Sequence, residues 1–265
     1  EITVSNGVVS HGNHSATFGE LAVAAAQQPT PDRSSLTLKT PAEFKLIGQD
    51  NTLRKDVGKH NGTAIYTQDV KLPGMLTAVV AHPPRFGAKV RSFDASAALA
   101  RRGVQQVFEI DSGVAVVASD YWTAIKAREQ LQIEWDASEA ETRSSGDILA
   151  QYRELVETPG AIAEAHGNPD SVLSASSDVT ELMFEYPYLA HAQMEPMNCV
   201  AQVNGDSAEM WYGCQSPTSD KAAIAQLLGT SGDKVTIHTV FAGGGFGRRA
   251  NPASDYVLES VQIAR

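Results

Sequence analysis

Val235–Gly247 reads V-T-I-H-T-V-F-A-G-G-G-F-G, and Arg248 and Arg249 follow it directly. Apolar and polar side chains alternate in its first half, which predicts a strand. A helical pattern begins near Ser254, so the glycines lie between a strand and a helix. Backbone N–H groups in such a loop can approach a bound anion closely, because glycine has no side chain to block it. We therefore expect a phosphate-bearing cofactor over Gly243–Gly247, with the arginines beside it.

Two other interpretations of this loop stay open. Glycine-rich turns often only let a strand reverse or a helix pack closely. Gly245, Gly247 and Ala250 also satisfy the dinucleotide fingerprint G-x-G-x-x-A. That match is weak, because Pro252 delays the helix and no acidic residue follows at the required distance before Arg265. A Walker loop is excluded, since no Gly-Lys-Ser/Thr follows the glycines.

Composition limits the class of protein. The sequence has 265 residues, 42% of them hydrophobic and 20% charged, which is typical of globular domains. The net charge of −10 argues against a nucleic-acid partner, which requires a basic surface. No apolar run has the length of a transmembrane helix. The sequence opens on Glu1 and ends at Arg265 within a helical pattern, so we expect a piece of a longer polypeptide.

The two cysteines, Cys199 and Cys214, are not spaced to hold an iron–sulfur cluster or a structural zinc ion. Cys199 lies in an alternating pattern and is most simply a small buried residue. A disulfide between the two is compatible with the sequence but is not required by it.

The patterns predict an α+β protein in four parts. Residues 1–42 form an N-terminal segment of a preceding region, with a turn at Asn6-Gly7 and a helix capped by Thr17. Residues 43–136 mix short strands and helices without regular β-α-β spacing, which indicates a small α+β domain. Residues 137–170 are an acidic, solvated linker with one helix. Residues 171–265 form a second α+β unit.

Within these parts we expect particular elements. The strands are placed at 75–82, 88–93, 104–110, 113–118, 131–135, 196–203 and 209–212, the last two joined across Asn204-Gly205. The helices are placed at 17–28, 95–101, 121–130, 148–156 and 219–228. In the helix 121–130, Trp122, Ala124 and Ile125 are expected to point inward. His82 and Arg85, in a proline-rich loop, are candidates to line an access path.

Four stretches in order resemble one family, the xanthine oxidase family of molybdenum hydroxylases. Lys55–Val70 with L-P-G-M-L after it resembles the opening of that family's hammerhead domain. A-H-A-Q-M-E-P at Ala190–Pro196 resembles the start of its molybdopterin-binding region. G-C-Q-S-P at Gly213–Pro217 and G-G-G-F-G at Gly243–Gly247 resemble its cofactor motifs. Four such motifs in order are far more specific than any one of them.

The N-terminal E-L-A and L-K and the Gly-Arg-Arg end of the loop resemble the isoquinoline 1-oxidoreductase β-subunit branch, which includes bacterial aldehyde and N-heterocycle dehydrogenases. The resemblance implies a molybdopterin cofactor, in bacteria usually molybdopterin cytosine dinucleotide. It implies hydroxylation of a small aldehyde or N-heterocycle with water as the oxygen source. The resemblance further implies that electrons leave through [2Fe-2S] clusters on an iron–sulfur partner subunit. The remainder of the same polypeptide is expected to be a further partner. The bacterial periplasm is the expected location, with the cytoplasm as the alternative.

The resemblance also implies residue roles. Gln215 matches the glutamine whose side-chain amide bonds an oxygen ligand of molybdenum, and is the candidate catalytic residue. The cofactor-binding candidates are Gly243, Gly244, Gly245, Phe246, Gly247 and Arg248. No metal ligand is expected from the protein, because the pterin holds the molybdenum. Ala250 stands where the xanthine-oxidising branch has a substrate-binding glutamate, and the family's catalytic base is expected outside this chain.

Alternatives remain for single residues and for the whole chain. His191 is expected to be a core or hydrogen-bonded histidine rather than a ligand. Glu195 is expected to bond backbone N–H groups rather than to be catalytic. Arg248 and Arg249 are either solvated surface charges or contacts to a cofactor or subunit. The alternative function is a non-catalytic fragment that acts as a cofactor half-site or a subunit-docking scaffold.

Overall fold

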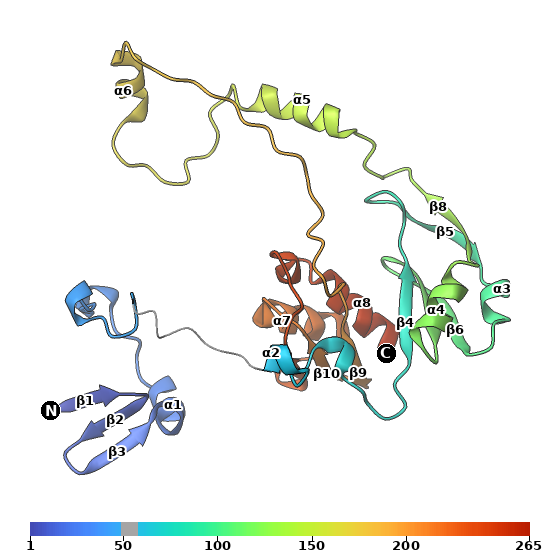
Figure 1. Ribbon diagram of the computed structural model, residues 1–265, viewed down its shortest axis with the longest axis horizontal. Coiled ribbons are helices and arrows are strands. Elements are labelled where there is room, and N and C mark those ends of the chain that lie inside the picture. The colour runs from blue at the N-terminus through green and yellow to red at the C-terminus, as the bar shows by residue number, and fades with distance from the viewer. Residues whose placement is uncertain (49–57) are drawn as a thin grey trace. The chain divides into compact units, whose positions relative to one another are not determined.

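The computed structural model describes residues 1–48 and 58–265. The chain forms two compact units, Glu1–Val57 and Gly58–Arg265 (Figure 1). The first three residues of the stretch that resembles the hammerhead opening, Lys55–Val57, lie outside the described residues. None of the helices in the described ranges combines the length and the apolar character that crossing a membrane requires.

The first unit contains a three-stranded antiparallel sheet followed by a helix. Its strands are β1 (Ile2–Ser5), β2 (Val8–His11) and β3 (His14–Thr17). Asn6 and Gly7 form the predicted turn, both at positive φ, 50° and 77°. α1 (Phe18–Ala26) begins as predicted, because the Thr17 hydroxyl accepts from the Glu20 N–H and the Glu20 carboxylate accepts from the Thr17 N–H. Short 3-10 turns follow at η1 (Arg33–Ser35) and η2 (Pro41–Glu43).

The second unit opens with α2 (Gly58–Asn61) and the 3-10 turn η4 (Thr67–Asp69). An antiparallel sheet of order β4-β7-β6 then follows. Its strands are β4 (Thr77–Ala81), β6 (Val104–Ile110) and β7 (Gly113–Ala118). Every residue of the central strand β7 is buried, as its unbroken run of small and apolar residues predicts. α3 (Ser96–Leu99) packs on β6, and α4 (Tyr121–Arg128) packs on β4 and β7.

The prediction that Trp122 points inward is wrong. Its side chain is 64% exposed and lies under the Lys126 ammonium, 4.9 Å from the ring centroid to Nζ. Ala124 and Ala127 are the buried residues of α4. Ala127 packs in a small cluster with buried residues of α3 and β7. α3 and α4 approach each other closely at this face, so only small side chains fit there. The pattern of hydrophobic residues in the sequence does not indicate this limit on side-chain size.

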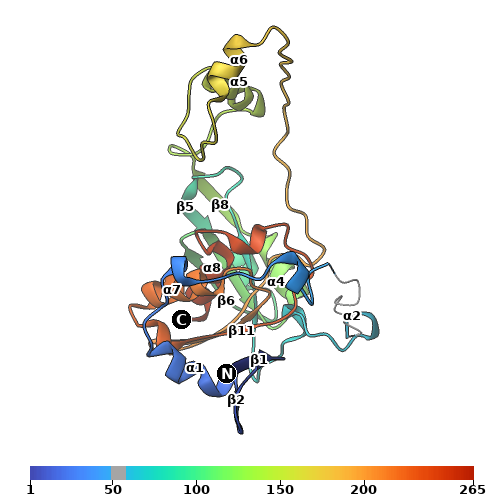
Figure 2. The ribbon, with the colours of Figure 1, turned by 90° about the vertical axis from the view of Figure 1, so that its left-hand side faces the viewer.

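β5 (Lys89–Asp94) and β8 (Gln132–Asp136) form a separate antiparallel two-stranded ribbon (Figure 2). The helix predicted at 148–156 is α5 (Ser145–Leu155), and α6 (Pro169–Ala175) follows it. Neither of these two helices buries a residue. Residues 176–199 contain no helix or strand, and most of their side chains are exposed.

A second sheet of order β11-β10-β9 lies towards the C-terminus. Its strands are β9 (Val200–Asn204), β10 (Ser207–Tyr212) and β11 (Val235–Thr239). β9 and β10 form the predicted hairpin around Asn204-Gly205. β10 and β11 are parallel, and the connection between them contains α7 (Pro217–Leu228) and the turn η5 (Gly232–Lys234). The chain ends in α8 (Asp255–Ala264), after the 3-10 turn η6 (Arg248–Ala250).

The main core lies between this sheet and the helices α7 and α8, which also contact each other. Burial alternates along β10, so that Ala208, Met210 and Tyr212 face the helices. α8 lies where the sequence predicts a helical pattern from near Ser254, and its buried residues Tyr256, Val257 and Val261 have the spacing of one helix face. The predicted mixed α+β class is therefore confirmed, and the strand and helix on either side of the glycine loop are both anchored in this core.

Polar side chains connect α8 to the first sheet of the second unit. The Glu259 carboxylate bonds the His82 ring and accepts from the Ser112 hydroxyl. In addition, the Asp111 N–H donates to Gln262 Oε1, 3.2 Å away. The hydrogen bond to Glu259 raises the pKa of His82, although burial and Arg128 oppose the rise and Asp255 adds to it.

A histidine whose pKa is raised in the folded state stabilises the fold. This contribution is fully present below the ordinary pKa of 6.5 and is lost as pH rises through the raised pKa. We therefore expect His82→Asn to lower the thermal midpoint at pH 6 more than at pH 8.5. Thermal melts across this pH range measure the difference. His60→Asn is the control, because the exposed side chain of His60 makes no hydrogen bond or ion pair to any described residue. A wild-type-to-variant difference that stays constant with pH would contradict the assignment.

Candidate cofactor site

Gln215 and the glycine loop lie at the same edge of the C-terminal sheet. β10 and β11 are parallel neighbours, with Tyr212 paired to Thr239 at their carboxyl ends. Gln215 follows β10 by three residues, and Gly243 follows β11 by four. Because the carboxyl ends of parallel strands meet at one edge, the topology brings two distant motifs together.

The Gln215 side chain is held by its carbonyl oxygen. The backbone N–H of Arg249 donates to Gln215 Oε1 over 3.1 Å. A backbone N–H can only donate, so this bond identifies which amide atom is oxygen. The amide NH2 of Gln215 donates to no described residue, and the side chain is exposed. Its two N–H groups are therefore available to an acceptor outside the described protein.

The glycine loop passes directly against this amide. A Cβ atom built on Gly245 would lie 2.8 Å from Gln215 Oε1, closer than side chains tolerate. A Cβ atom on Gly243 would lie 2.5 Å from Glu195 Cβ. The glycines at these positions thus permit the loop to contact both neighbours.

The loop turns in the left-handed region of backbone conformation. Gly244 and Gly247 have φ of 101° and 87°, and Phe246 has φ of 50° although it is not glycine. The Phe246 side chain is 76% exposed. The successive N–H groups of residues 244–247 donate no hydrogen bond to any residue that the structure describes. Such a run of free N–H groups is suited to an anionic ligand.

Arg249 is almost fully buried beneath the loop, with 1% of its surface exposed. Its Nε donates to Gly244 O at 2.8 Å, and a terminal nitrogen donates to Gly213 O at 3.4 Å. The other terminal nitrogen donates to Glu195 O at 3.2 Å and pairs with the Glu195 carboxylate at 3.0 Å. One guanidinium therefore joins three chain segments, and the interpretation of Arg249 as a solvated surface charge is wrong.

Glu195 completes this arrangement. The Gly243 N–H donates to Glu195 Oε2 at 2.8 Å, and the Glu195 N–H donates to Gly243 O at 3.0 Å. The prediction that Glu195 bonds backbone N–H groups is confirmed. Asn198 Nδ2 donates to Glu195 Oε1 at 3.1 Å, while Asn198 Oδ1 is buried without a partner among the described residues. The buried ion pair of Arg249 and Glu195 thus holds the glycine loop through hydrogen bonds to Gly243 and Gly244.

Arg248 points to a different partner. Its two terminal nitrogens bond the two oxygens of Asp255 in the first turn of α8, at 3.0 and 2.7 Å. The bond to Asp255 raises the pKa of Arg248. The side chain remains 29% exposed. The role of Arg248 in cofactor binding stays a prediction.

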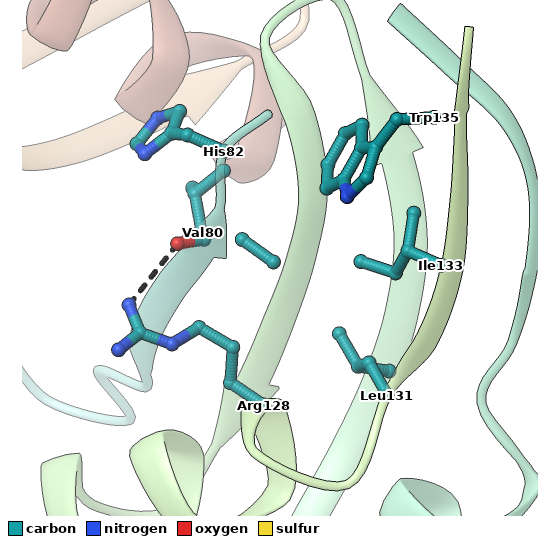
Figure 3. A pocket seen from close by; sticks show the side chains of 7 residues that line it. Val80, His82, Arg128, Leu131, Ile133 and Trp135 are labelled. Carbon is teal, nitrogen blue, oxygen red and sulfur yellow. Dashed lines mark hydrogen bonds between the residues drawn. The ribbon is translucent and has the colours of Figure 1, made fainter. Parts of the chain in front are cut away.

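A cavity of about 460 Å³ lies away from these residues, between β4, α4 and β8 (Figure 3). His82 and Trp135 face it from opposite sides, and Arg128 donates to Val80 O at 3.2 Å beside it. The candidate His82 therefore lines a cavity, whereas Arg85 is not among its lining residues. None of the predicted cofactor-binding residues lines it either.

Residues 155–261 match the family described as the molybdopterin cofactor-binding domain. The chain is 35% identical over 251 residues to the isoquinoline 1-oxidoreductase subunit beta of Brevundimonas diminuta, covering 91% of this chain and 32% of that protein. It is 32% identical over 279 residues to the membrane-bound aldehyde dehydrogenase (pyrroloquinoline-quinone) of Gluconacetobacter polyoxogenes, covering 99% of this chain and 36% of that protein.

The chain belongs to the xanthine oxidase family of molybdenum hydroxylases.

The crystal structure of quinoline 2-oxidoreductase from Pseudomonas putida 86 has a similar fold, with a TM-score of 0.58 and 20% sequence identity. The similarity covers 80% of this chain and 33% of that one. The chain thus spans about a third of the length of the two relatives named above. Within that third lies a molybdopterin-binding region of the family, as the four motifs predict.

Other residues of this molybdopterin-binding region differ from expectation. His191 is exposed and bonds no described residue, so its assignment as a core or hydrogen-bonded histidine is wrong. It lies in the segment 176–199, where no neighbouring strand covers it. The dinucleotide interpretation fails as well, because α8 begins only at Asp255 and not at the glycines.

Cys199 and Cys214 are free thiols, so no disulfide joins them. Burial raises the pKa of Cys199 to about 12 and that of Cys214 to about 11, which keeps both thiols protonated. Across residues 1–48 and 58–265, no three His, Cys, Asp or Glu side chains gather so as to hold a metal ion.

Sequence analysis did not predict the Arg249–Glu195 ion pair, although a signal for it existed. Two of the four family motifs have opposite charges in or beside them: Glu195 lies in A-H-A-Q-M-E-P, and Arg249 lies two residues after G-G-G-F-G. Two motifs that meet at one site would bring those charges together. Thr67 was missed too; its hydroxyl accepts from the Gly213 N–H over 3.2 Å and connects the N-terminal part of the second unit to this site.

Proposed function

We propose that this chain is part of the molybdenum-cofactor-binding subunit of an oxidoreductase. The full-length protein hydroxylates a small aldehyde or N-heterocycle with water as the oxygen source, and passes electrons to an iron–sulfur partner. The names of the relatives support this, since one is an isoquinoline oxidoreductase subunit and another an aldehyde dehydrogenase. Residues 43–136 are proposed to be the hammerhead-like domain, and residues 171–265 part of the molybdopterin-binding domain, with the acidic linker 137–170 between them.

The observation that carries the proposal is the position of the Gln215 amide. Its oxygen accepts from the Arg249 N–H, its two N–H donors have no partner among the described residues, and the side chain is exposed beside Gly245 of the glycine loop. A neutral amide can donate to an oxygen acceptor without adding charge to it. The free N–H groups of residues 244–247 suit the anionic part of a pterin dinucleotide. The residues present therefore fit a molybdopterin group.

Each residue has a defined part in the proposed site. Gln215 donates to an acceptor atom of the bound cofactor and orients it. Gly243–Gly247 allow close approach of the cofactor, and the backbone of Phe246 and Gly247 lies beside it. Arg248 contacts the anionic tail, proposed to be the cytosine dinucleotide form. When bound, the molybdenum–pterin group supplies the redox chemistry, and the chain supplies orientation and hydrogen-bond donors.

The test is elemental and nucleotide analysis of the full-length protein, purified together with its iron–sulfur partner. We expect about one molybdenum atom and one cytosine nucleotide per chain, released on acid treatment, as stoichiometric cofactor binding requires. Oxidation of aldehydes and N-heterocycles is then assayed with an artificial electron acceptor. A folded full-length protein without molybdenum or pterin would contradict the proposal. A different nucleotide would contradict the cytosine form alone.

A further inference from the structure

Asp220 is a buried carboxylate that has no place in the motifs described above. It lies in the first turn of α7, and 1% of its surface is exposed. No basic side chain of the described residues pairs with it. Three uncharged donors bond it instead, and the N-terminal end of the helix favours its negative charge.

The three donors come from the two segments that form the candidate site. Tyr212 OH donates to Asp220 Oδ2 over 2.9 Å, and Cys214 Sγ donates to the same oxygen over 3.2 Å. Ser254 Oγ donates to Asp220 Oδ1 over 2.6 Å. Tyr212 ends β10, and Cys214 immediately precedes Gln215. Ser254 is the first residue before α8, on the far side of the glycine loop.

Further contacts surround these three hydrogen bonds. The ring of Tyr212 packs edge-on against Tyr256 of α8, with centroids 5.8 Å apart at 82°. The Tyr256 hydroxyl donates to Gly213 O over 3.4 Å. Burial is the main cause that raises the pKa of both tyrosines, so both hydroxyls remain donors at neutral pH. Ser254 itself has a φ of 49°, which is unfavourable for serine and is maintained by its contacts.

We propose that Asp220 is a positioning residue, which sets the separation between the Gln215 amide and the glycine loop. It does so by accepting hydrogen bonds from Cys214, just before Gln215, and from Ser254, after the loop. It touches neither cofactor nor substrate and acts through Gln215. This inference rests on the proposed function of Gln215. Since each carboxylate oxygen accepts from a different segment, one side chain fixes both segments relative to α7.

Asp220→Asn tests the inference, because asparagine has the same size but replaces one accepting oxygen with a donating NH2 group. At least one of the three donors then loses its acceptor. Asp233→Asn is the matched control, since Asp233 is exposed in η5. Both changes are made in the full-length protein with its partner, in the wild-type and the Gln215→Ala backgrounds. The readouts are kcat, KM, molybdenum per chain and the Mo(V) electron paramagnetic resonance signal.

In the wild-type background we expect Asp220→Asn to lower kcat about 10-fold, with KM and molybdenum content changed less than about twofold and the Mo(V) signal shifted. In the Gln215→Ala background the same change should alter kcat by less than about twofold, because residues that act through one another are not additive. Equal losses in both backgrounds, or full turnover in Asp220→Asn, would overturn the inference. Wild-type turnover in Gln215→Ala alone would overturn the role proposed for Gln215, whereas a full-length protein without molybdenum or pterin would overturn the proposed function.

Ser254→Ala keeps the inference testable if Asp220→Asn does not fold. It removes one donor to Asp220 and leaves the carboxylate with the other two. We expect kcat to fall about 3-fold to 10-fold, and to be unaffected in the Gln215→Ala background. Ser260→Ala in the same helix, where Ser260 Oγ donates to Val257 O over 2.7 Å, should leave kcat unchanged. Equal kcat values for Ser254→Ala and Ser260→Ala would reject the role of Asp220.

Discussion

Arg249→Met will lower the free energy of unfolding of the second unit by about 3–5 kcal/mol, the cost of breaking a buried ion pair by removing one partner. Glu195 would be left without the guanidinium that pairs with it, with only 9% of its side chain exposed to solvent. The carbonyl oxygens of Gly244 and Gly213 would also lose their donors. Urea unfolding followed by tryptophan fluorescence measures this, because all three tryptophans lie between residues 122 and 211, in the second unit.

Arg248→Met is the matched control for this prediction. Arg248 is the adjacent arginine and pairs with Asp255, but it is 29% exposed. Partly solvated pairs contribute about 0–1 kcal/mol, so we expect a small shift. The double variant Arg249→Met, Glu195→Gln should be less destabilised than the sum of the two single changes, since removing both charges leaves none unpaired. Equal losses of unfolding free energy for Arg248→Met and Arg249→Met would show that burial does not determine how much the Arg249–Glu195 pair stabilises the fold.

Gln215→Ala in the full-length protein, purified with the proposed iron–sulfur partner, will reduce kcat about 10²–10³-fold, the effect of removing one oriented donor from a reaction centre. Molybdenum content should stay near that of the wild type, because the loop itself is held by Arg249 and Glu195. Gln215→Glu should lose as much activity, although its carboxylate can still accept the Arg249 N–H. That variant separates the donating NH2 group from the accepting oxygen.

Gln226→Ala is the control for Gln215→Ala, since Gln226 is an exposed residue of α7 remote from the loop in sequence. Its kcat should remain within about twofold of the wild type. Steady-state kinetics and metal analysis on the same samples give both readouts. Wild-type turnover in Gln215→Ala, with molybdenum present, would remove the role assigned to this glutamine.

The local rules of helices and turns were sufficient for many elements. Thr17 and Glu20 are three residues apart and form the predicted capping box at α1. Asn204-Gly205 produces the hairpin between β9 and β10, and Gly229 ends α7 in the left-handed conformation. These features depend on residues that are near neighbours in sequence. The same is true of the buried face of α8, which follows from a periodicity of 3.6 residues.

Predictions about single side chains failed where the neighbours come from elsewhere in the chain. Trp122 is exposed because α4 packs against α3 through Ala127. His191 is exposed because residues 176–199 have no paired strand. Whether such a residue is buried depends on the surface it meets, and a single stretch of sequence does not contain that surface.

The sequence by itself determined the family, the mixed α+β class and the candidate site residues. The motifs and the local periodicity that indicate them each lie within a short stretch of sequence. Only the tertiary structure decided that Gln215 meets Gly245, since this depends on the parallel pairing of β10 with β11. It also decided the roles of two adjacent arginines, which look alike in sequence. Arg249 is buried with Glu195, whereas Arg248 reaches Asp255 near the surface. Successive side chains leave the backbone in different directions, so the two arginines meet different neighbours. Those neighbours come from other parts of the chain, and they determine whether each guanidinium is buried and which carboxylate it pairs with.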